Sequence, residues 1–139
     1  VTTHYDEKDE QSRALAYRFD APDRSIAFTG DTGPSANVES LAQKADLLVS
    51  EIMDPDKAIE MLEKKRPDVN FAVRALVRRH FSKEHLAPIE AGLMAKRANV
   101  KALVLTHNAL PPDFLDEARK SIAENYSGPI TFAKDLQSF

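Results

Sequence analysis

Acidic and imidazole side chains stand at the ends of three predicted strands. Asp31 follows the β-prone run over residues 25–29, Glu51 ends an apolar run, and His107 follows a third such run. In open α/β sheets, ligands and catalytic groups collect where strands end and loops begin. Metal sites are built from carboxylates and imidazoles of this kind. The pattern indicates a functional site, with Asp31 and His107 as its candidates.

Asp31 lies in the tetrapeptide Gly-Asp-Thr-Gly, which has two other interpretations. Aspartate before Thr-Gly forms an Asx-turn and can precede a helix, in which case its role is structural. Asp-Thr-Gly is also the active-site triplet of the aspartic proteases, in which two carboxylates share one proton. That fold is nearly all β and has an apolar residue before the aspartate, where this chain has Gly30. The protease interpretation is therefore disfavoured.

The other histidines of the chain are His4, His80 and His85. Histidine is often an ordinary surface or core residue. We expect this of His80, which lies in the polar stretch RRHFSKEH. His107 differs because it follows a buried strand directly, as Asp31 does.

The composition is that of one globular domain. With 139 residues, 42% of them hydrophobic, the chain is long enough to bury a core of its own. The lack of cysteine excludes disulfides and thiolate zinc sites, so histidine, aspartate or glutamate must hold any metal ion. No apolar run could span a bilayer and no signal peptide is visible, so we expect a soluble protein without a membrane partner. The compartment stays open, with the cytoplasm favoured.

The formal net charge of -3 does not indicate a positively charged surface for binding phosphate backbones. Basic residues do cluster at 64–66 and 74–79, where we expect a solvated helix face. A nucleic-acid partner is therefore less expected than a small-molecule substrate.

The hydrophobic periodicity predicts a mixed α/β layer. Alternating apolar residues predict a strand over residues 12–20, and a turn leads into a second strand over residues 25–29. The later elements are expected, in order, as a helix at 37–45, a buried parallel strand at 46–51, helices at 55–65, from 67 onward and at 88–98, a strand at 100–105, a helix at 112–126 and a strand at 130–133. In this α/β arrangement, Asp31 and His107 should converge at one edge of the sheet.

Three strings carry a family resemblance: SIAFTGDTGPSANVESLAQKADLLVSE, HLAPIEAGLMAKRANVKALVLTH and GPITFAKDLQSF. In this order and spacing they resemble the second half of a metallo-β-lactamase-fold hydrolase, in the branch that includes ribonuclease Z and arylsulfatase-like enzymes. The resemblance runs from Arg13 to Phe139. It implies an α/β fold, namely the C-terminal half of the four-layer αββα sandwich. Residues 1–139 would form a single domain whose N-terminal half is absent from this chain.

The resemblance also implies a dinuclear metal site, usually of zinc. Asp31 would bridge the two divalent ions and His107 would bind one of them. His85 would be catalytic, because the matching histidine steadies developing negative charge or protonates the leaving group. Glu90 would support its helix or accept an outer hydrogen bond.

The chain departs from the family pattern at several positions. Phe28 replaces the carboxylate that ribonuclease Z places three residues before the bridging aspartate, which argues against RNA processing. Ser50 replaces a frequent histidine, so Glu51 is expected to be structural, and Ala87 removes an N-cap. The family's first metal motif, His-x-His-x-Asp-His, does not occur in the chain.

These observations predict a metal-dependent hydrolase once the N-terminal half is supplied, by the same protein or by a separate chain. A metal-bound hydroxide would attack an ester-like substrate: a phosphodiester, sulfate ester, lactone or thioester. The alternative is a metal-free relative of the same fold that acts as a binding or scaffolding module. The sequence is also compatible with a homo-oligomer.

Overall fold

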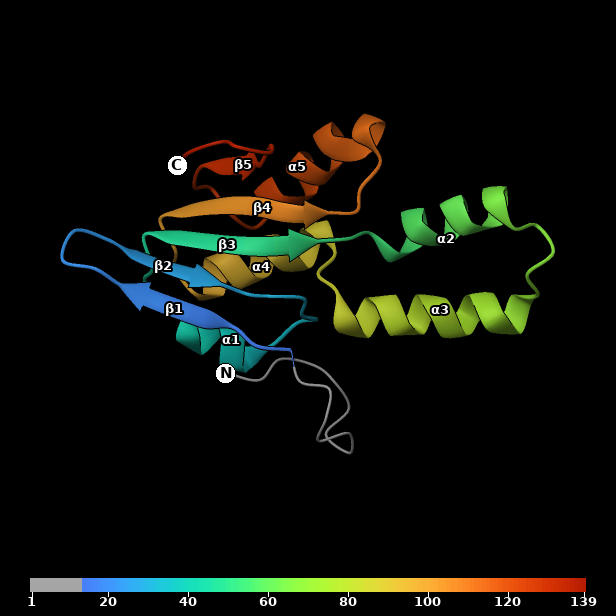
Figure 1. The fold of residues 1–139 in the computed structure, drawn as a ribbon, viewed down its shortest axis with the longest axis horizontal. Coiled ribbons are helices and arrows are strands. Elements are labelled where there is room, and N and C mark those ends of the chain that lie inside the picture. Colours follow the sequence, from blue (N-terminus) through green and yellow to red (C-terminus); the bar gives the residue numbers. More distant parts are fainter. Residues whose placement is uncertain (1–13) are drawn as a thin grey trace.

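The computed structural model describes residues 14–139, and its centre is one five-stranded mixed sheet (Figure 1). The strands lie in chain order: β1 (Tyr17–Asp20), β2 (Ser25–Phe28), β3 (Leu47–Ile52), β4 (Ala102–Asn108) and β5 (Ile130–Phe132). β1 and β2 are antiparallel, whereas the other neighbouring pairs are parallel. The predicted mixed sheet is confirmed. His4 and the first residues of the strand expected over 12–20 lie outside the described residues.

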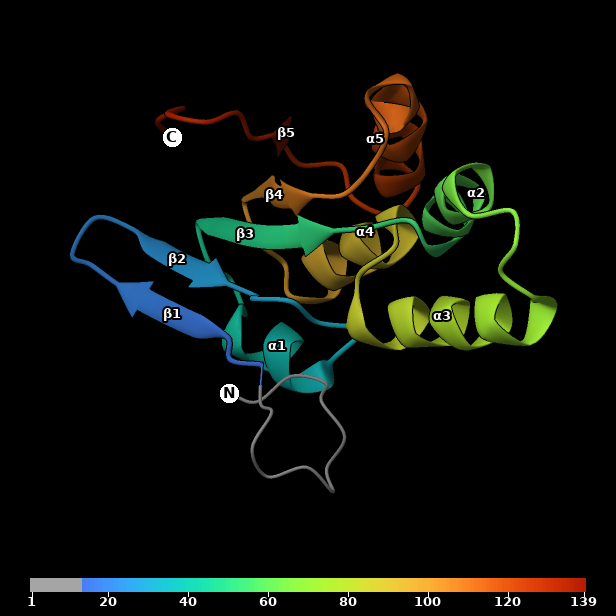
Figure 2. The ribbon, with the colours of Figure 1, turned by 45° about the vertical axis from the view of Figure 1, so that its right-hand side comes forward.

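Three helices pack on one face of this sheet (Figures 1 and 2). They are α1 (Ala36–Leu41), α4 (Pro88–Arg97) and α5 (Leu115–Ala123), and a short 3-10 turn, η1 (Pro112–Phe114), precedes α5. The core between helices and sheet is fully buried and includes Leu48, Met94, Leu103, Leu105 and Ile122.

Helices α4 and α5 cross at close range. A Cβ atom at Gly92 would come within 2.5 Å of the carbonyl oxygen of Ile122, so only glycine fits at this crossing. The close contact holds α4 against α5, and α4 begins directly after the segment that carries His85.

The opposite face of the sheet carries exposed apolar side chains. Tyr17 and Phe28 are register partners, and the rings of Phe19 and Phe28 meet edge to face with centroids 6.0 Å apart. Their exposed fractions are 53% for Tyr17, 62% for Phe19 and 39% for Phe28. Such a contiguous apolar surface is typical of a face that another element covers.

A helical hairpin extends from the body between β3 and α4 (Figure 2). It consists of α2 (Pro55–Lys65) and α3 (Phe71–Glu84), and neither helix contains a buried residue. The start of α2 is as predicted, with Asp54 accepting a hydrogen bond from the backbone N–H of Lys57. The start predicted at Pro67 is wrong. Asn70 supplies the cap instead, by accepting from the backbone N–H of Val73, so α3 begins at Phe71.

Other boundaries also differ from the sequence-based expectation. α1 ends at Leu41, α5 begins at Leu115 after the 3-10 turn, and β4 extends through His107 to Asn108. Ala87 makes no side-chain cap, as expected. Among the described helices, none has the length and apolar character needed to cross a membrane.

Candidate metal centre

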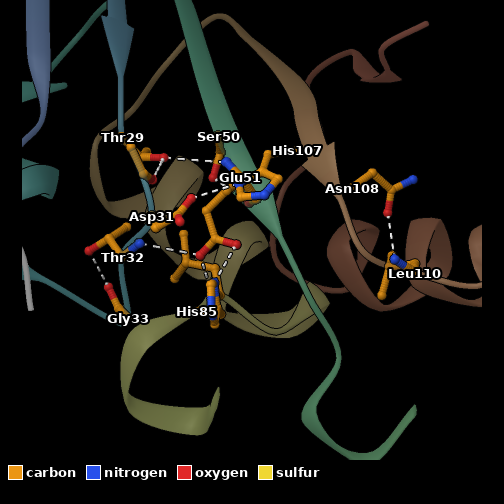
Figure 3. Close-up of polar contacts among 12 residues, drawn as sticks. Thr29, Asp31, Thr32, Gly33, Ser50, Glu51, His85, His107, Asn108 and Leu110 are labelled. Atoms are coloured by element: carbon orange, nitrogen blue, oxygen red, sulfur yellow. Dashed lines mark hydrogen bonds and ion pairs between the residues drawn. The ribbon is translucent and has the colours of Figure 1, made fainter. Parts of the chain in front are cut away.

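Asp31 and His107 meet where β2 and β4 end, as the sequence predicted. Oδ1 of Asp31 lies 2.7 Å from Nδ1 of His107, although the two residues are 76 positions apart in the chain (Figure 3). Both strands run parallel to β3, which lies between them, so their carboxyl ends share one edge of the sheet. Both side chains are accessible, with exposed fractions of 37% for Asp31 and 68% for His107.

The loop that carries Asp31 has a backbone that its glycines make possible. Gly30 has φ +61°, and a Cβ atom there would come within 2.6 Å of the carbonyl oxygen of Leu15. The hydroxyl of Thr29 donates to the carbonyl of Gly30, and that of Thr32 donates to the carbonyl of Gly33. The conformation of Gly30 and the two threonine hydroxyls shape the loop around Asp31, and the Asx-turn expected of Asp31 itself stays a prediction.

His107 is directed by an irregularity in β4. Ser50 pairs with Leu105 but Ile52 pairs with Asn108, so β4 carries an extra residue at this point. Bulges of this kind redirect a side chain and occur next to active sites. His107 itself has φ +44°, in the left-handed region that residues other than glycine adopt uncommonly. Both features lie at the position where His107 contacts Asp31.

Glu51 lies beneath this pair and is 3% exposed. Its Oε1 accepts hydrogen bonds from the backbone N–H of Leu86 at 2.8 Å and of Thr32 at 3.3 Å. Its Oε2 lies 3.2 Å from Nδ1 of His85 (Figure 3). Glu51 thus joins the Asp31 loop to the segment that contains His85. The buried polar side chains of residues 14–139 all gather here: Thr29, Thr32, Ser50 and Glu51.

Burial shifts the ionisation of both members of the Glu51–His85 pair. Loss of solvation raises the pKa of Glu51 to about 8, against the lowering effect of the backbone N–H groups of Leu86 and Thr32. Burial also lowers the pKa of His85, against the raising effect of the nearby Asp31 and Glu84 carboxylates. Desolvation disfavours the charged form of each group. The site therefore favours a neutral imidazole at His85.

The available donors suit a divalent ion. Asp31, Glu51 and His85 each offer one ligand atom, and these atoms all lie within 4.8 Å of one another. With His107 they make two carboxylates and two imidazoles, a donor set that zinc accepts. Glu51 was not among the predicted ligands, because Ser50 before it suggested a structural role. Its place near the end of β3, beside the ends of β2 and β4, is the sequence feature that could have assigned it to this site.

The remaining candidates lie apart from this centre or behave as expected. His80 pairs with Glu84 along α3 and is largely exposed, in keeping with an ordinary surface histidine. Glu90 is in the first turn of α4, where a carboxylate favours the helix dipole.

A cavity of about 460 Å³ opens beside the centre, on the apolar face of the sheet. Asp31, Glu51 and His107 line it together with the exposed aromatic side chains of β1 and β2. His85 is outside this lining, on the other side of Glu51, and its side chain is 15% exposed.

Comparison with known proteins places this geometry in a family. The sequence model of the Beta-lactamase superfamily domain matches residues 2–108. A putative ribonuclease Z of Mycobacterium tuberculosis (strain CDC 1551 / Oshkosh) is 27% identical over 124 residues, which cover 88% of this chain and 50% of that protein. A ribonuclease Z of Mycobacterium sp. (strain KMS) is 36% identical over 98 residues, which cover 70% of this chain and 30% of that protein.

Among solved structures, the metallo-beta-lactamase fold protein YhfI from Bacillus subtilis superimposes with a TM-score of 0.65 at 22% identity. The match covers 96% of this chain and 45% of that one, and it shows a shared fold. The chain spans half or less of the length of the curated relatives described above. Because the family's sequence model matches most of its residues, this chain belongs to the β-lactamase superfamily and has part of the metallo-β-lactamase fold.

Proposed function

We propose that the complete protein is a metal-dependent hydrolase of ester-like bonds, and that this chain supplies one side of its metal centre. The observation that carries the proposal is the 2.7 Å contact between Asp31 and His107 at the shared edge of the sheet. A carboxylate and an imidazole brought together at strand ends, beside a cavity, are a suitable start for metal-assisted hydrolysis.

Asp31 and His107 are the proposed ligands, with Asp31 between two divalent ions, for which zinc is the proposed identity. Such ions supply Lewis acidity, which activates water and polarises the bond to be cleaved. Two ions that each take four or more ligands need more donors than these two residues. We assign the others to an N-terminal half of the fold outside this chain. The open apolar face of the sheet and the partial coverage of the relatives support that assignment.

His85 is the proposed catalytic residue beside the ions. Its Nδ1 is directed toward Glu51, so Nε2 is the ring nitrogen left to meet a substrate oxygen or the leaving group. Burial favours the neutral ring, which can donate or accept a proton according to its tautomer. Because Glu51 lines the cavity and His85 does not, this role requires the substrate to extend beyond Glu51 to reach His85.

Among the ester-like substrates, phosphodiesters come first. The relatives described above carry the name ribonuclease Z, and a ribonuclease cleaves phosphodiester bonds. Phe28, in place of a carboxylate, argues against the same proton relay in this chain. Sulfate esters, lactones and thioesters remain the competing substrate classes.

The test is metal analysis of the purified complete protein, together with chromogenic esters of the four classes. We expect bound zinc or a similar ion and fastest hydrolysis of the phosphodiester. Removal of the ion by a chelator should abolish turnover, and its return should restore it. A protein that binds no divalent ion and cleaves none of the esters would instead be a binding or scaffolding module.

A further inference from the structure

Glu51 contacts two segments that are distant from it and from each other in the sequence. Through Oε1 it accepts from the backbone of Thr32, next to Asp31, and from the backbone of Leu86, next to His85. Through Oε2 it faces the ring of His85 itself. One side chain from β3 thus touches the neighbours of both proposed functional residues.

Stability alone does not account for a carboxylate at this position. Moving a carboxylate from water into a protein interior is unfavourable, and hydrogen bonds offset the cost only in part. Apolar residues of similar volume are often neutral or stabilising replacements for buried charged groups. A buried carboxylate with all its contacts directed at the Asp31 and His85 segments is better explained by what it positions.

We propose that Glu51 is a positioning residue that orients His85 and selects its tautomer, with the proton on Nδ1 and the lone pair on Nε2. The inference rests on the proposed function and narrows it: with the proton on Nδ1, Nε2 of His85 accepts a proton from a reacting group and can donate one to a leaving group only afterwards. The reason is the chemistry of the pair. Once ionised, above its pKa of about 8, the Glu51 carboxylate only accepts hydrogen bonds, so the imidazole nitrogen that faces it must carry the proton.

Glutamine at this position tests the inference, because it keeps the shape and changes the direction of one hydrogen bond. In Glu51→Gln, the amide oxygen can still accept from the backbone N–H groups of Leu86 and Thr32. The amide nitrogen then faces Nδ1 of His85 as a donor, so Nδ1 must become the acceptor. We therefore expect the proton to move to Nε2 in this variant.

The measurement is long-range 1H–15N correlation NMR of the complete, metal-free protein labelled with 15N-histidine. Spectra are recorded above the pKa of about 8 that burial gives Glu51, so that the carboxylate is ionised. The His85→Gln variant identifies the His85 signals. Glu90→Gln is the matched control, because it removes one carboxylate from α4 that makes no hydrogen bond to His85 within residues 14–139.

The expected result is Nδ1–H in the wild type and in Glu90→Gln, and Nε2–H in Glu51→Gln. An Nε2–H tautomer in the wild type would overturn the proposal even if Glu51→Gln failed to fold. So would an unchanged tautomer in a folded Glu51→Gln, and if zinc binding were lost there as well, Glu51 would be a ligand instead. The spectra need neither metal nor substrate, so a failure of the proposed hydrolase activity is seen separately.

Discussion

The carboxylate of Asp31 is within 2.7 Å of the imidazole of His107, and the contact joins the ends of two strands that do not pair with each other. Strand β3 lies between β2 and β4, so the contact crosses over the end of β3. It brings the two proposed metal ligands to one place.

Replacement of Asp31 by asparagine separates its structural role from ligation. Asparagine can form the same Asx-turn, so Asp31→Asn should fold with a melting curve close to that of the wild type. It lacks the negative charge that offsets repulsion between two cations about 3.5–4 Å apart. We expect loss of at least one ion per chain and of most turnover, measured by mass spectrometry of bound metal beside the melting curve. Full metal occupancy with ordinary turnover would defeat the assignment.

Removal of the His85 side chain should affect rate rather than metal binding. A group that donates or accepts a proton in the transition state contributes about 10²–10⁴-fold to turnover. We expect His85→Ala to lower kcat by roughly 100-fold or more, with metal content nearly unchanged. His80→Ala is the control, since His80 lies on α3 and pairs with Glu84. Equal turnover in the two variants would reduce His85 to a residue that merely precedes a helix.

The crossing of α4 and α5 gives a stability prediction that is independent of function. In Gly92→Ala the added Cβ would lie 2.5 Å from the carbonyl oxygen of Ile122, so the helices must move apart. Overpacking of this kind costs about 1–3 kcal/mol of unfolding free energy. Denaturant titration of the complete protein would measure it. Lys96→Ala, on the exposed side of the same helix, should change stability far less.

Asp46 directly precedes β3, and its ionised carboxylate should make the free energy of unfolding fall in acid. The Lys101 ammonium, followed by the backbone N–H and hydroxyl of Ser25, holds the pKa of the Asp46 carboxyl well below its usual range. A group with a lowered folded-state pKa stabilises the fold above its unfolded pKa, and the effect is lost as the pH falls through the folded pKa.

The melting temperature of the wild type should therefore exceed that of Asp46→Asn at neutral pH. The difference should begin to shrink as the pH falls below about 4, the pKa of an unfolded aspartate. Asp20→Asn, a change at an exposed carboxylate that pairs with Arg18, serves as the comparison. A constant difference between wild type and Asp46→Asn across this pH range would contradict the prediction.

The sequence predicted that Asp31 and His107 share one edge of the sheet because this follows from strand direction, whereas the bulge in β4 beside His107 was not predicted. Apolar runs followed by polar residues mark strand ends, and parallel strands bring those ends to one edge. The role of Glu51 was harder to predict from the sequence, because its contacts depend on how closely the Asp31 and His85 segments approach β3 in three dimensions. The start of α3 was missed for a local reason: Pro67 and Asn70 both resemble helix starts, and the Asn70 side chain makes the cap.

The α2–α3 hairpin leaves and re-enters the body at a single point. The backbone N–H of Met53 donates to the carbonyl of Leu86 at 3.0 Å, and Glu51 binds the N–H of the same residue. The hairpin is thus closed at its base by bonds that do not involve its tip. For protein engineering, the turn at residues 67–69, before the Asn70 cap, is accordingly a place to insert a fluorescent label or a purification peptide, whose bulk would be held away from the strand ends.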